Sequence, residues 1–316
     1  MNNSIWLIGS GPMAIDYCKV LLEMGIKPIV IGRGESSAQK LKEATGIDVI
    51  VGGLVNFLSS MPQLPSCAIV AVGVDQLAKV TEQLISYGIN RILLEKPGGI
   101  NSSEILNIAN ISRIYGVRTV IAYNRRYYAS VQKAKQIIEQ DGGVTSFFFE
   151  FTEWSHIIEK LSKPMSIMNS WFLANSSHVI DLAFFLGGYP KEIYCKVLGS
   201  LTWHPAASCF FGSGISETGA GFSYIANWSA PGRWGLEIMT KSSRLILRPL
   251  EQLQIMRLGS IVPEQVLIDD TLDKKFKPGL YREVEAFLKD RLQDACLIDY
   301  QAMILPVYMK MAGYQE

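Results

Sequence analysis

The chain has almost no net charge, no closely paired cysteines and no long apolar run, and each absence excludes a class of protein. Its 30 basic and 29 acidic side chains give a formal charge of +1, which provides neither a basic surface for nucleic acid nor an acidic tail. Apolar runs stop well short of the roughly 18 residues that cross a bilayer. We therefore expect no nucleic acid and no membrane among its partners.

The cysteines are few and scattered along the chain. No two have the C-x-x-C spacing of a zinc or redox site; they are Cys18, Cys67, Cys195, Cys209 and Cys296. Such usage is typical of a reduced compartment, and we expect no metal. Residues 1–9 look like a strand, because they lack the basic region and the small-residue cleavage site of a signal peptide. The sequence thus predicts a cytoplasmic protein.

The first 122 residues alternate short apolar runs with amphipathic stretches. At 316 residues, 48% of them hydrophobic, the chain is long and apolar enough for two globular domains. Expected strands are residues 4–9, 28–32, 68–72, 91–94 and 119–122, and expected helices are residues 14–24, 38–45, 76–87 and 103–115. Continuous Ile, Val and Leu favour strands buried on both faces of a parallel sheet. Residues 1–122 therefore predict a doubly wound α/β domain.

The pattern changes in residues 123–316. Expected strands, rich in aromatic and β-branched residues, are 145–154, 192–202, 221–229, 234–240 and 244–249. They follow one another with few helices between, which predicts a second α/β domain with an open, mostly antiparallel sheet. The glycine-rich segment 208–221 predicts a mobile loop or a hairpin. Residues 280–293 and 297–312 predict two closing helices.

A glycine turn follows the first expected strand. Gly9-Ser10-Gly11-Pro12-Met13-Ala14 has the G-x-G-x-x-A pattern of a dinucleotide-binding Rossmann domain. Gly9 permits the tight turn, Gly11 lets the backbone approach a pyrophosphate, and Ala14 lets the helix pack closely on the sheet. The helix N-terminus favours phosphate charge. The alternative is a structural turn with no ligand. Candidate cofactor contacts here are Gly9, Gly11, Pro12, Met13 and Ala14.

The end of the second expected strand bears on the choice between NAD(H) and NADP(H). An acidic residue there would hold a ribose 2′-hydroxyl, but the chain has Arg33, which can pair with a 2′-phosphate or stack on adenine. Ser36, Ser37 and Lys40 are within reach. Glu35 leaves the NAD(H) alternative open, and Arg33 can also be a solvated loop charge. We expect NADP(H) to be favoured over NAD(H).

Glu95-Lys96-Pro97 follows the fourth expected strand at the carboxyl edge, where ligands of open α/β sheets bind. A lysine among apolar groups beside a cationic nicotinamide has a lowered pKa and can donate to a substrate hydroxyl. The alternative is an ordinary surface lysine. We expect Lys96 to be catalytic and to contact both cofactor and substrate, with Glu95 and Pro97 also lining the cofactor site.

His178 is the second catalytic candidate. Ser176 and Ser177 can cap a helix that starts near His178, and the positive end of the helix favours a neutral imidazole that acts as a general base. Asp181, one turn later, can orient the ring or an adjacent strand. The alternative is a buried histidine bonded to backbone. His156 and His204 have no such setting, and we expect structural roles for them.

Residues 123–128 follow the fifth expected strand and therefore lie at the same sheet edge. Asn124 can contact cofactor or substrate, and one of Arg125 and Arg126 is expected to pair with a carboxylate. Trp171 and Tyr127 are candidate surfaces for a sugar, although a core role is equally compatible with their context. Candidate substrate contacts are Lys96, Tyr123, Asn124, Trp171, Asn175 and His178.

On these motifs the chain resembles the Gfo/Idh/MocA family of oxidoreductases: Gly9-x-Gly11-x-x-Ala14, Glu95-Lys96-Pro97, Asn124-x-Arg126 and His178-x-x-Asp181. The resemblance covers essentially the whole chain. It implies an N-terminal Rossmann domain, then a substrate-binding α/β domain whose open sheet forms a homodimer or tetramer, with the last helices returning to the first domain. It also implies NAD(P)-dependent oxidation or reduction of a sugar, nucleotide sugar or cyclitol. Residues 175–188 resemble members found in bacterial surface-polysaccharide and nonulosonic-acid sugar pathways.

Two departures from the family pattern bear on the chemistry. Many members carry an aspartate where this chain has Ala174, so the usual set with lysine and histidine is incomplete. The element after the third strand reads Val72-Gly73, which leaves backbone contacts to the cofactor. Ala174 favours one alternative, a non-catalytic sensor or scaffold that binds NADP(H) or a sugar. A sugar epimerase that uses its cofactor without net redox is a third possibility.

Overall fold

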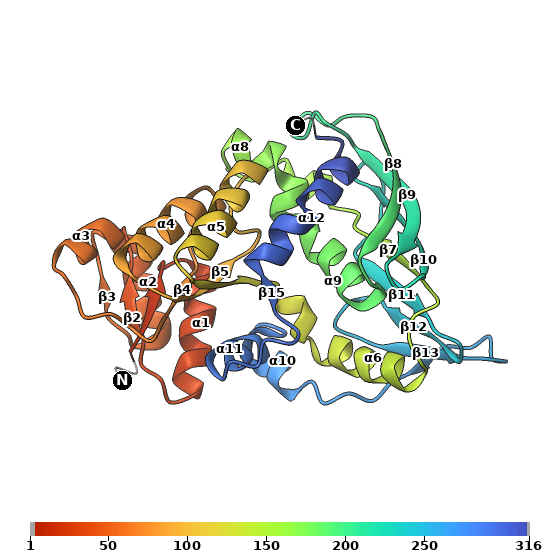
Figure 1. The fold of residues 1–316 in the computed structure, drawn as a ribbon, viewed down its shortest axis with the longest axis horizontal. Helices are drawn as coiled ribbons and strands as arrows, with labels where there is room; N and C mark the ends of the chain where they lie inside the picture. Colours follow the sequence, from red (N-terminus) through yellow and green to blue (C-terminus); the bar gives the residue numbers. More distant parts are fainter. Residues whose placement is uncertain (1–3, 315–316) are drawn as a thin grey trace. The chain divides into compact units, whose positions relative to one another are not determined.

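A computed structural model describes residues 4–314 (Figure 1), so the first three residues of the strand expected at 1–9 lie outside the described part. The chain forms two compact units. The first comprises residues up to Tyr123 together with Lys275–Met303, and the second comprises Asn124–Lys274 and the residues from Ile304 onward. Each unit has its own sheet.

The first unit contains a sheet of the order β15-β6-β5-β4-β1-β2-β3. Its strands are β1 Ile5–Ile8, β2 Ile29–Ile31, β3 Val49–Ile50, β4 Cys67–Val70, β5 Arg91–Glu95, β6 Arg118–Ala122 and β15 Cys296–Leu297. All pairs are parallel except that of the edge strand β15 with β6. This topology confirms the doubly wound sheet, and it brings the carboxyl ends of β1, β2, β4 and β5 to one edge.

Helices connect these strands, as the alternating pattern predicts. They are α1 Pro12–Glu23, α2 Glu35–Thr45, α3 Gly53–Ser59, η1 Val74–Gln76, α4 Leu77–Tyr87, α5 Ser102–Ile114 and α11 Leu280–Leu288. The α5 N-terminus shows the local cause: Asn101 accepts from the Glu104 amide at 2.9 Å, and Glu104 accepts from the Ile100 amide at 2.9 Å. The sequence patterns missed β3 and α3, which are short.

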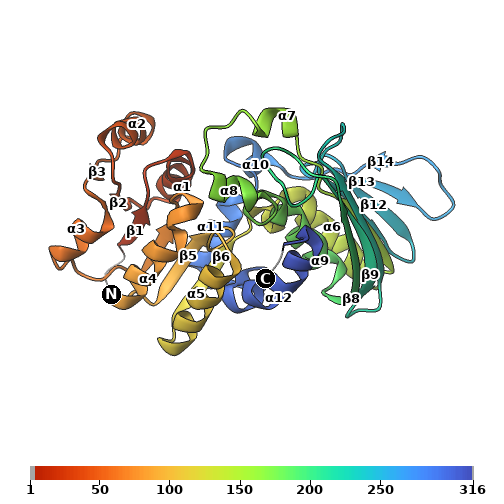
Figure 2. The ribbon, with the colours of Figure 1, turned by 90° about the horizontal axis from the view of Figure 1, so that it is seen from above.

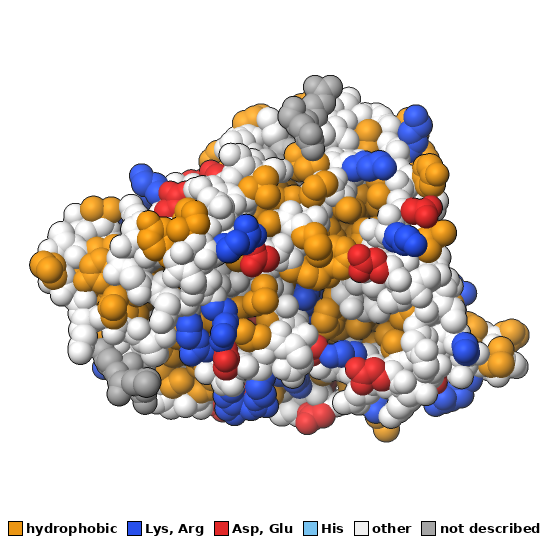
Figure 3. All heavy atoms as spheres, viewed as in Figure 1, with side chains coloured by type: hydrophobic (Ala, Val, Ile, Leu, Met, Phe, Trp, Pro, Cys, Tyr) orange, Lys and Arg blue, Asp and Glu red, His pale blue; other side chains and the backbone are white. Residues whose placement is uncertain are grey.

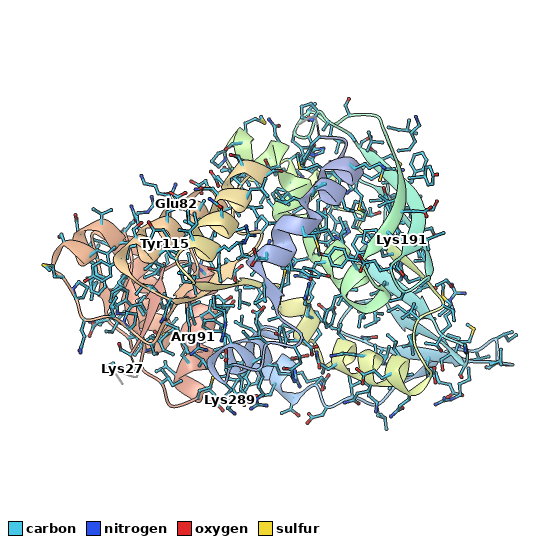
Figure 4. The ribbon with its side chains drawn as sticks, viewed as in Figure 1. Lys27, Glu82, Arg91, Tyr115, Lys191 and Lys289 are labelled. Atoms are coloured by element: carbon cyan, nitrogen blue, oxygen red, sulfur yellow. The ribbon has the colours of Figure 1, made fainter. Side chains whose placement is uncertain are left out.

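A helix from late in the sequence completes the core of the first unit. Leu280, Val284 and Phe287 of α11 are buried with Ala14 and Tyr17 of α1. Arg91, labelled in Figure 4, donates to the carbonyl of Phe287 at 2.6 Å and lies over its ring at 5.2 Å. The start of β5 is thereby fixed to the helix.

The second unit contains a sheet of the order β14-β13-β12-β11-β7-β10-β9-β8. The strands are β7 Ser146–Glu150, β8 Pro190–Leu198, β9 Cys209–Ser216, β10 Gly221–Asn227, β11 Gly235–Met239, β12 Ser243–Leu247, β13 Gln254–Arg257 and β14 Glu264–Gln265. The pairs are antiparallel except β7 with β10, which is parallel. The expected open, mostly antiparallel sheet is confirmed.

The glycine-rich segment 208–221 is largely strand, so the expectation of a mobile loop is wrong, although β9 and β10 do form a hairpin. A Cβ on Gly212 would lie 2.6 Å from the Tyr224 hydroxyl, and one on Gly214 would lie 2.6 Å from the Phe222 ring. A backbone carbonyl of β8 is closer still, that of Tyr194 at 2.2 Å for Gly212 and that of Glu192 at 2.0 Å for Gly214, so backbone and rings together leave room only for glycine.

Helices cover one face of this second sheet (Figure 2). α6 Ala129–Gln140 and α9 Ser177–Gly187 pack against its strands. The unit also contains η2 Asn124–Tyr127, α7 Ser155–Ile158, α8 Met165–Asn169, the π-helical η3 Phe172–Ser176, α10 Thr271–Lys275 and the end of α12 Ile298–Ala312. Phe184 of α9 packs edge-on against Phe147, Phe149 and Phe222. None of the helices in the described part of the chain is long and apolar enough to span a membrane.

Candidate active site

The glycine turn of the first unit is set by packing. Gly9 has φ of +120°, and a Cβ there would lie 2.2 Å from the carbonyl oxygen of Ala71, just after β4. Its amide donates to the Ile31 carbonyl at 2.8 Å. Ala14 is fully buried where α1 meets the sheet. Both residues therefore have the small size that the pattern predicted for them.

Gly11 has the opposite environment. A Cβ on it would meet no heavy atom of residues 4–314 within 4 Å. It forms the N-cap of α1 without a side-chain hydrogen bond, Pro12 occupies the first turn, and no acidic side chain is there. Backbone amides of the first turn, including those of Met13 and Ala14, have no intrahelical acceptors. Open space and free donors at a helix N-terminus suit a phosphate group.

The loop after β2 presents Arg33 to solvent. Its stem passes Gly53, where a Cβ would be 3.3 Å from the Arg33 Cγ, and no ion pair or hydrogen bond joins its guanidinium to another described residue. Ser37 donates to the Gly34 carbonyl at 3.0 Å and lies 2.7 Å from the Ser10 hydroxyl. Ser37 thus ties this loop to the glycine turn.

The ends of β4 and β5 supply the next residues. Val72 and Gly73 follow β4, half-buried and exposed respectively. Lys96 directly follows β5 and is half-buried. The Glu95 carboxylate accepts from the buried Tyr17 hydroxyl at 2.8 Å. Burial raises the pKa of Glu95, and the charge of Lys96 counteracts the rise. Glu95 therefore anchors α1 to β5 and places a negative charge beside Lys96.

Pro97 and Tyr123 are fixed by a single buried amide. Gln301 donates to the Pro97 carbonyl and to the Tyr123 hydroxyl, each at 3.1 Å. Tyr123, predicted as a substrate contact, is 1% exposed. These bonds hold the turn that carries Lys96.

In the second unit, His178 lies in the first turn of α9 and is buried. The expected serine cap is wrong: Ser176 is itself helical, with φ of −65° and ψ of −23°, and makes no capping bond. The backbone is already wound into the π-helical segment η3 before α9 begins. Such π-segments occur frequently at functional sites.

Glu153 is a buried carboxylate that the sequence patterns missed. It is 3% exposed and accepts from Asn175 Nδ2 at 2.9 and 3.1 Å and from the Ser176 hydroxyl at 2.8 Å. These donors come directly after Ala174, where the resemblance leads one to expect an aspartate. The available signal was one acidic residue in the apolar run after β7.

Asp181 pairs with Arg126, which confirms that an arginine of residues 123–128 binds a carboxylate. The guanidinium donates twice, at 2.8 and 2.6 Å, and both side chains are almost fully buried. Burial raises the pKa of Asp181, and Arg126 counteracts the rise. Asp181 thus fixes η2 to α9.

The remaining candidates of the second unit are buried. Asn124 lies at the start of η2, and Tyr127 ends that turn. Trp171 packs edge-on against Trp203 with centroids 6.0 Å apart, and its indole nitrogen makes no hydrogen bond within the described residues. His204 bonds to the Ala207 carbonyl at 2.8 Å, in keeping with a structural role. No cluster of His, Cys, Asp or Glu among residues 4–314 could hold a metal.

The structure thus gathers the predicted residues into two sets. Within the first unit, the glycine turn, Arg33, Ser37, Val72, Gly73 and Lys96 all follow parallel strands at their carboxyl edge. Within the second, Asn175 and His178 lie in consecutive turns, and Asn175 is bonded to Glu153.

Comparisons with known proteins give the fold. No protein-family model matches the chain, and no curated protein matches its sequence. Among solved structures, a UDP-N-acetylglucosamine 3-dehydrogenase from Acidithiobacillus ferrooxidans is similar at 14% identity and a TM-score of 0.75, covering 99% of this chain and 97% of the other. An NAD-binding oxidoreductase from Klebsiella pneumoniae is similar at 17% identity and a TM-score of 0.76, covering 98% and 96%.

A levoglucosan dehydrogenase in complex with NADH and levoglucosan is similar at 16% identity and a TM-score of 0.76, covering 98% of this chain and 96% of the other. The chain therefore has the fold of these oxidoreductases over nearly its whole length. This likeness is consistent with the resemblance to the Gfo/Idh/MocA family that the motifs indicate.

Proposed function

We propose that the chain is an NAD(P)-dependent oxidoreductase that acts on a CH–OH group or ketone of a sugar or nucleotide sugar. The observation that carries the proposal is the open, uncapped N-terminus of α1 at Gly11, directly after β1 of a doubly wound sheet. Lys96 at the end of β5, on the same sheet edge, supports a reaction at that edge. The dehydrogenases of similar fold act on sugars by their names.

Within the first unit, the α1 N-terminus would hold the pyrophosphate of the cofactor. Arg33, exposed and without an ion pair in the described part, would bind a 2′-phosphate, so we propose that NADP(H) is favoured over NAD(H). Val72 and Gly73 would contact the cofactor through backbone. Glu95 contributes indirectly, since its carboxylate holds Tyr17 and lies beside Lys96.

A bound nicotinamide would accept or supply the hydride. Lys96 would donate a hydrogen bond to the reacting oxygen of the substrate, and His178 would take or return the hydroxyl proton. Glu153 would act as a positioning residue, because its hydrogen bonds fix Asn175 and Ser176, immediately before the turn that carries His178. A buried negative charge there would replace the one that Ala174 lacks.

We propose that the protein acts in the cytoplasm of a bacterium, in the biosynthesis of surface polysaccharide. The support for this finer assignment is the resemblance of residues 175–188 to members of such pathways. The chemistry requires a sugar that carries a secondary alcohol or a ketone.

Binding and turnover test the proposal in sequence. We expect NADPH to bind in a fluorescence titration and to be consumed with a keto-sugar or keto-nucleotide sugar from a panel. Gly11→Asp should abolish dinucleotide binding without unfolding the protein, because a Cβ at Gly11 meets open space and the new charge would repel phosphate. Gly221→Asp, at another open glycine, is the matched control.

The outcomes separate the alternatives. Absence of dinucleotide binding in the unaltered protein contradicts the proposal. Binding without turnover of any substrate favours the sensor or scaffold. Oxidised cofactor that stays bound through purification and is unchanged after turnover favours a sugar epimerase.

A further inference from the structure

Two arginines share one indole ring in the second unit. The guanidinium carbon of Arg125 lies 4.6 Å from the ring centroid of Trp234, and that of Arg233 lies 5.0 Å from the same centroid. Trp234 is buried, Arg125 is half-buried and Arg233 is exposed. The group extends outward, because Arg233 also lies 4.6 Å from the Trp154 ring.

Neither arginine has a carboxylate partner. In residues 4–314, no ion pair or hydrogen bond joins the guanidinium of Arg125 or that of Arg233 to another residue, whereas the backbone carbonyl of Arg233 accepts from Arg248 at 3.5 Å. Other arginines of the unit are paired closely: Arg126 with Asp181 at 2.6 Å and Arg248 with Glu150 at 2.7 Å. Among the described residues, Arg257 also lacks such a pair but is exposed on β13, whereas the guanidinium groups of Arg125 and Arg233 share one buried indole.

This arrangement is unfavourable without an anion. Burial lowers the pKa of Arg125, and the like charge of Arg233 lowers it further, while Tyr128, Glu251 and Glu153 act in the opposite direction from a distance. An arginine stays protonated in proteins, so the cost of two neighbouring positive charges remains. A negatively charged ligand group between them would remove that cost.

The indole adds a donor and a link to the proposed base. The Trp234 nitrogen is buried and makes no hydrogen bond within the described residues, which leaves a donor that an acceptor would stabilise. The ring of His178 lies 6.2 Å from that of Trp234. Both guanidinium groups and the histidine ring therefore lie within 6.2 Å of one indole centroid.

We propose that Arg125 and Arg233, held on Trp234, form a subsite for an anionic group of the substrate, a carboxylate or a phosphate. Guanidinium forks match the oxygens of both groups. The inference rests on the proposed function and narrows it: the substrate is an acidic sugar, a sugar phosphate or a nucleotide sugar, and a neutral sugar binds poorly.

Matched ligands test the subsite. Titration calorimetry of the full chain would compare glucose with glucuronate, glucose 1-phosphate and UDP-glucose. We expect at least one anionic ligand to bind roughly ten- to a hundredfold more tightly than glucose, as a charged hydrogen-bonded contact allows. The tightest of the three identifies the source of the charge. Equal affinity for glucose and all three anionic ligands overturns the inference.

Variants locate the effect. Arg125→Gln and Arg233→Gln should each remove most of the preference for the anionic ligand and leave NADPH and glucose binding unchanged. Arg257→Gln is the control, because Arg257 is exposed on β13 and its substitution removes the same positive charge. If Arg125→Gln fails to fold, Arg233→Gln still decides, since its side chain is exposed. The subsite is contradicted if Arg233→Gln keeps the preference for the anionic ligand and Arg257→Gln loses it.

The two proposals fail separately. Unchanged turnover of an anionic substrate in both arginine variants would remove the anion subsite and leave the oxidoreductase in place. If the protein binds anionic ligands through both arginines but binds no dinucleotide, the subsite is supported and the proposal of an oxidoreductase is contradicted.

Discussion

Asn175 donates its side-chain amide to both oxygens of the buried Glu153 carboxylate, at 2.9 and 3.1 Å. The neighbouring Ser176 hydroxyl donates to the same carboxylate at 2.8 Å. A buried carboxylate is stable when donors satisfy its oxygens. This contact therefore connects the segment after β7 to the π-helical turn that leads into α9, and so to His178.

Glu153→Gln should destabilise the protein. The new amide would turn a donor toward the donors of Asn175 and Ser176, and loss of a hydrogen bond to a charged group costs about 1.5–3 kcal/mol. Chemical denaturation measures the change in the free energy of unfolding. Glu264→Gln, at an exposed position on β14, should change it by less than about 0.5 kcal/mol. Equal stability of the two variants would show that the Glu153 contact contributes nothing.

The Arg126–Asp181 pair should contribute far more than a surface pair. Asp181→Ala leaves a buried guanidinium without its partner, which costs about 3–5 kcal/mol. The exposed pair of Lys274 and Asp270 is the comparison, and Lys274→Met should cost no more than about 1 kcal/mol. Thermal and urea unfolding of both variants check the contrast. A loss below about 1 kcal/mol for Asp181→Ala would contradict it.

The parts that local pattern controls could be predicted from the sequence. Strands of continuous Ile, Val and Leu, glycines after helices and the G-x-G-x-x-A turn have causes within a few residues, and the structure has them where the patterns indicate. Contacts between distant residues could not be predicted. Spacing predicted that Asp181 orients His178 or an adjacent strand, and it gave no sign of Arg126, 55 residues away, with which Asp181 pairs.

Residues that are required by tertiary packing were misinterpreted for the same reason, because the groups they pack against are distant in the sequence. Gly212 and Gly214 look like loop glycines until the rings of Tyr224 and Phe222 are in place above them. Glu153 has no motif, and its role depends on donors more than twenty residues later in the chain.

Cofactor preference depends on Arg33. We expect NADPH to bind more tightly than NADH, and Arg33→Ala to reduce the ratio by roughly tenfold or more, since a charged hydrogen bond to a 2′-phosphate is lost. Fluorescence titration with both dinucleotides measures the ratio. Lys27→Ala, at an exposed position before the amino end of β2, is a control for general loss of positive charge. Equal affinities in the unaltered protein, or an unchanged ratio in Arg33→Ala, would refute the preference.

The open face of the second sheet should form a homo-oligomer. Strand register places Tyr194, Ile215 and Ile225 of β8, β9 and β10 on one face, at 75%, 44% and 44% exposure. Figure 3 shows hydrophobic side chains among charged ones along the edge where Figure 1 draws β8 and β9. The same register places Glu192 and Lys196 on this face, so its exposed apolar side chains stand among charges, and contact with a second copy would cover them.

Light scattering at micromolar concentration should therefore give a dimer or tetramer. Tyr194→Glu with Ile225→Glu should produce a monomer, because two charges would be buried in the contact. Ile114→Glu, at an exposed position on α5, should leave the assembly intact. A monomer of the unaltered 35.1 kDa chain would contradict the prediction.

The assignment of the chemistry rests on Lys96 and His178. Lys96→Met and His178→Ala should each leave dinucleotide affinity nearly unchanged and lower kcat by about 10²–10⁴, the usual contribution of one general acid or base. Lys79→Met and His156→Ala, at exposed positions, make the same replacements as controls and should leave kcat unchanged. Steady-state kinetics with the substrate from the panel gives both parameters.

The double variant tests whether the two groups act on one oxygen. If both serve the same proton transfer, the loss in the double variant is smaller than the product of the single losses, because residues that act as a unit are not additive. A fully multiplicative loss assigns them to separate steps. A rise in KM with unchanged kcat means that the residues only bind the sugar. If neither single variant changes turnover, Lys96 and His178 are not catalytic. That result, together with Ala174, would favour the hypothesis that the chain is a sensor.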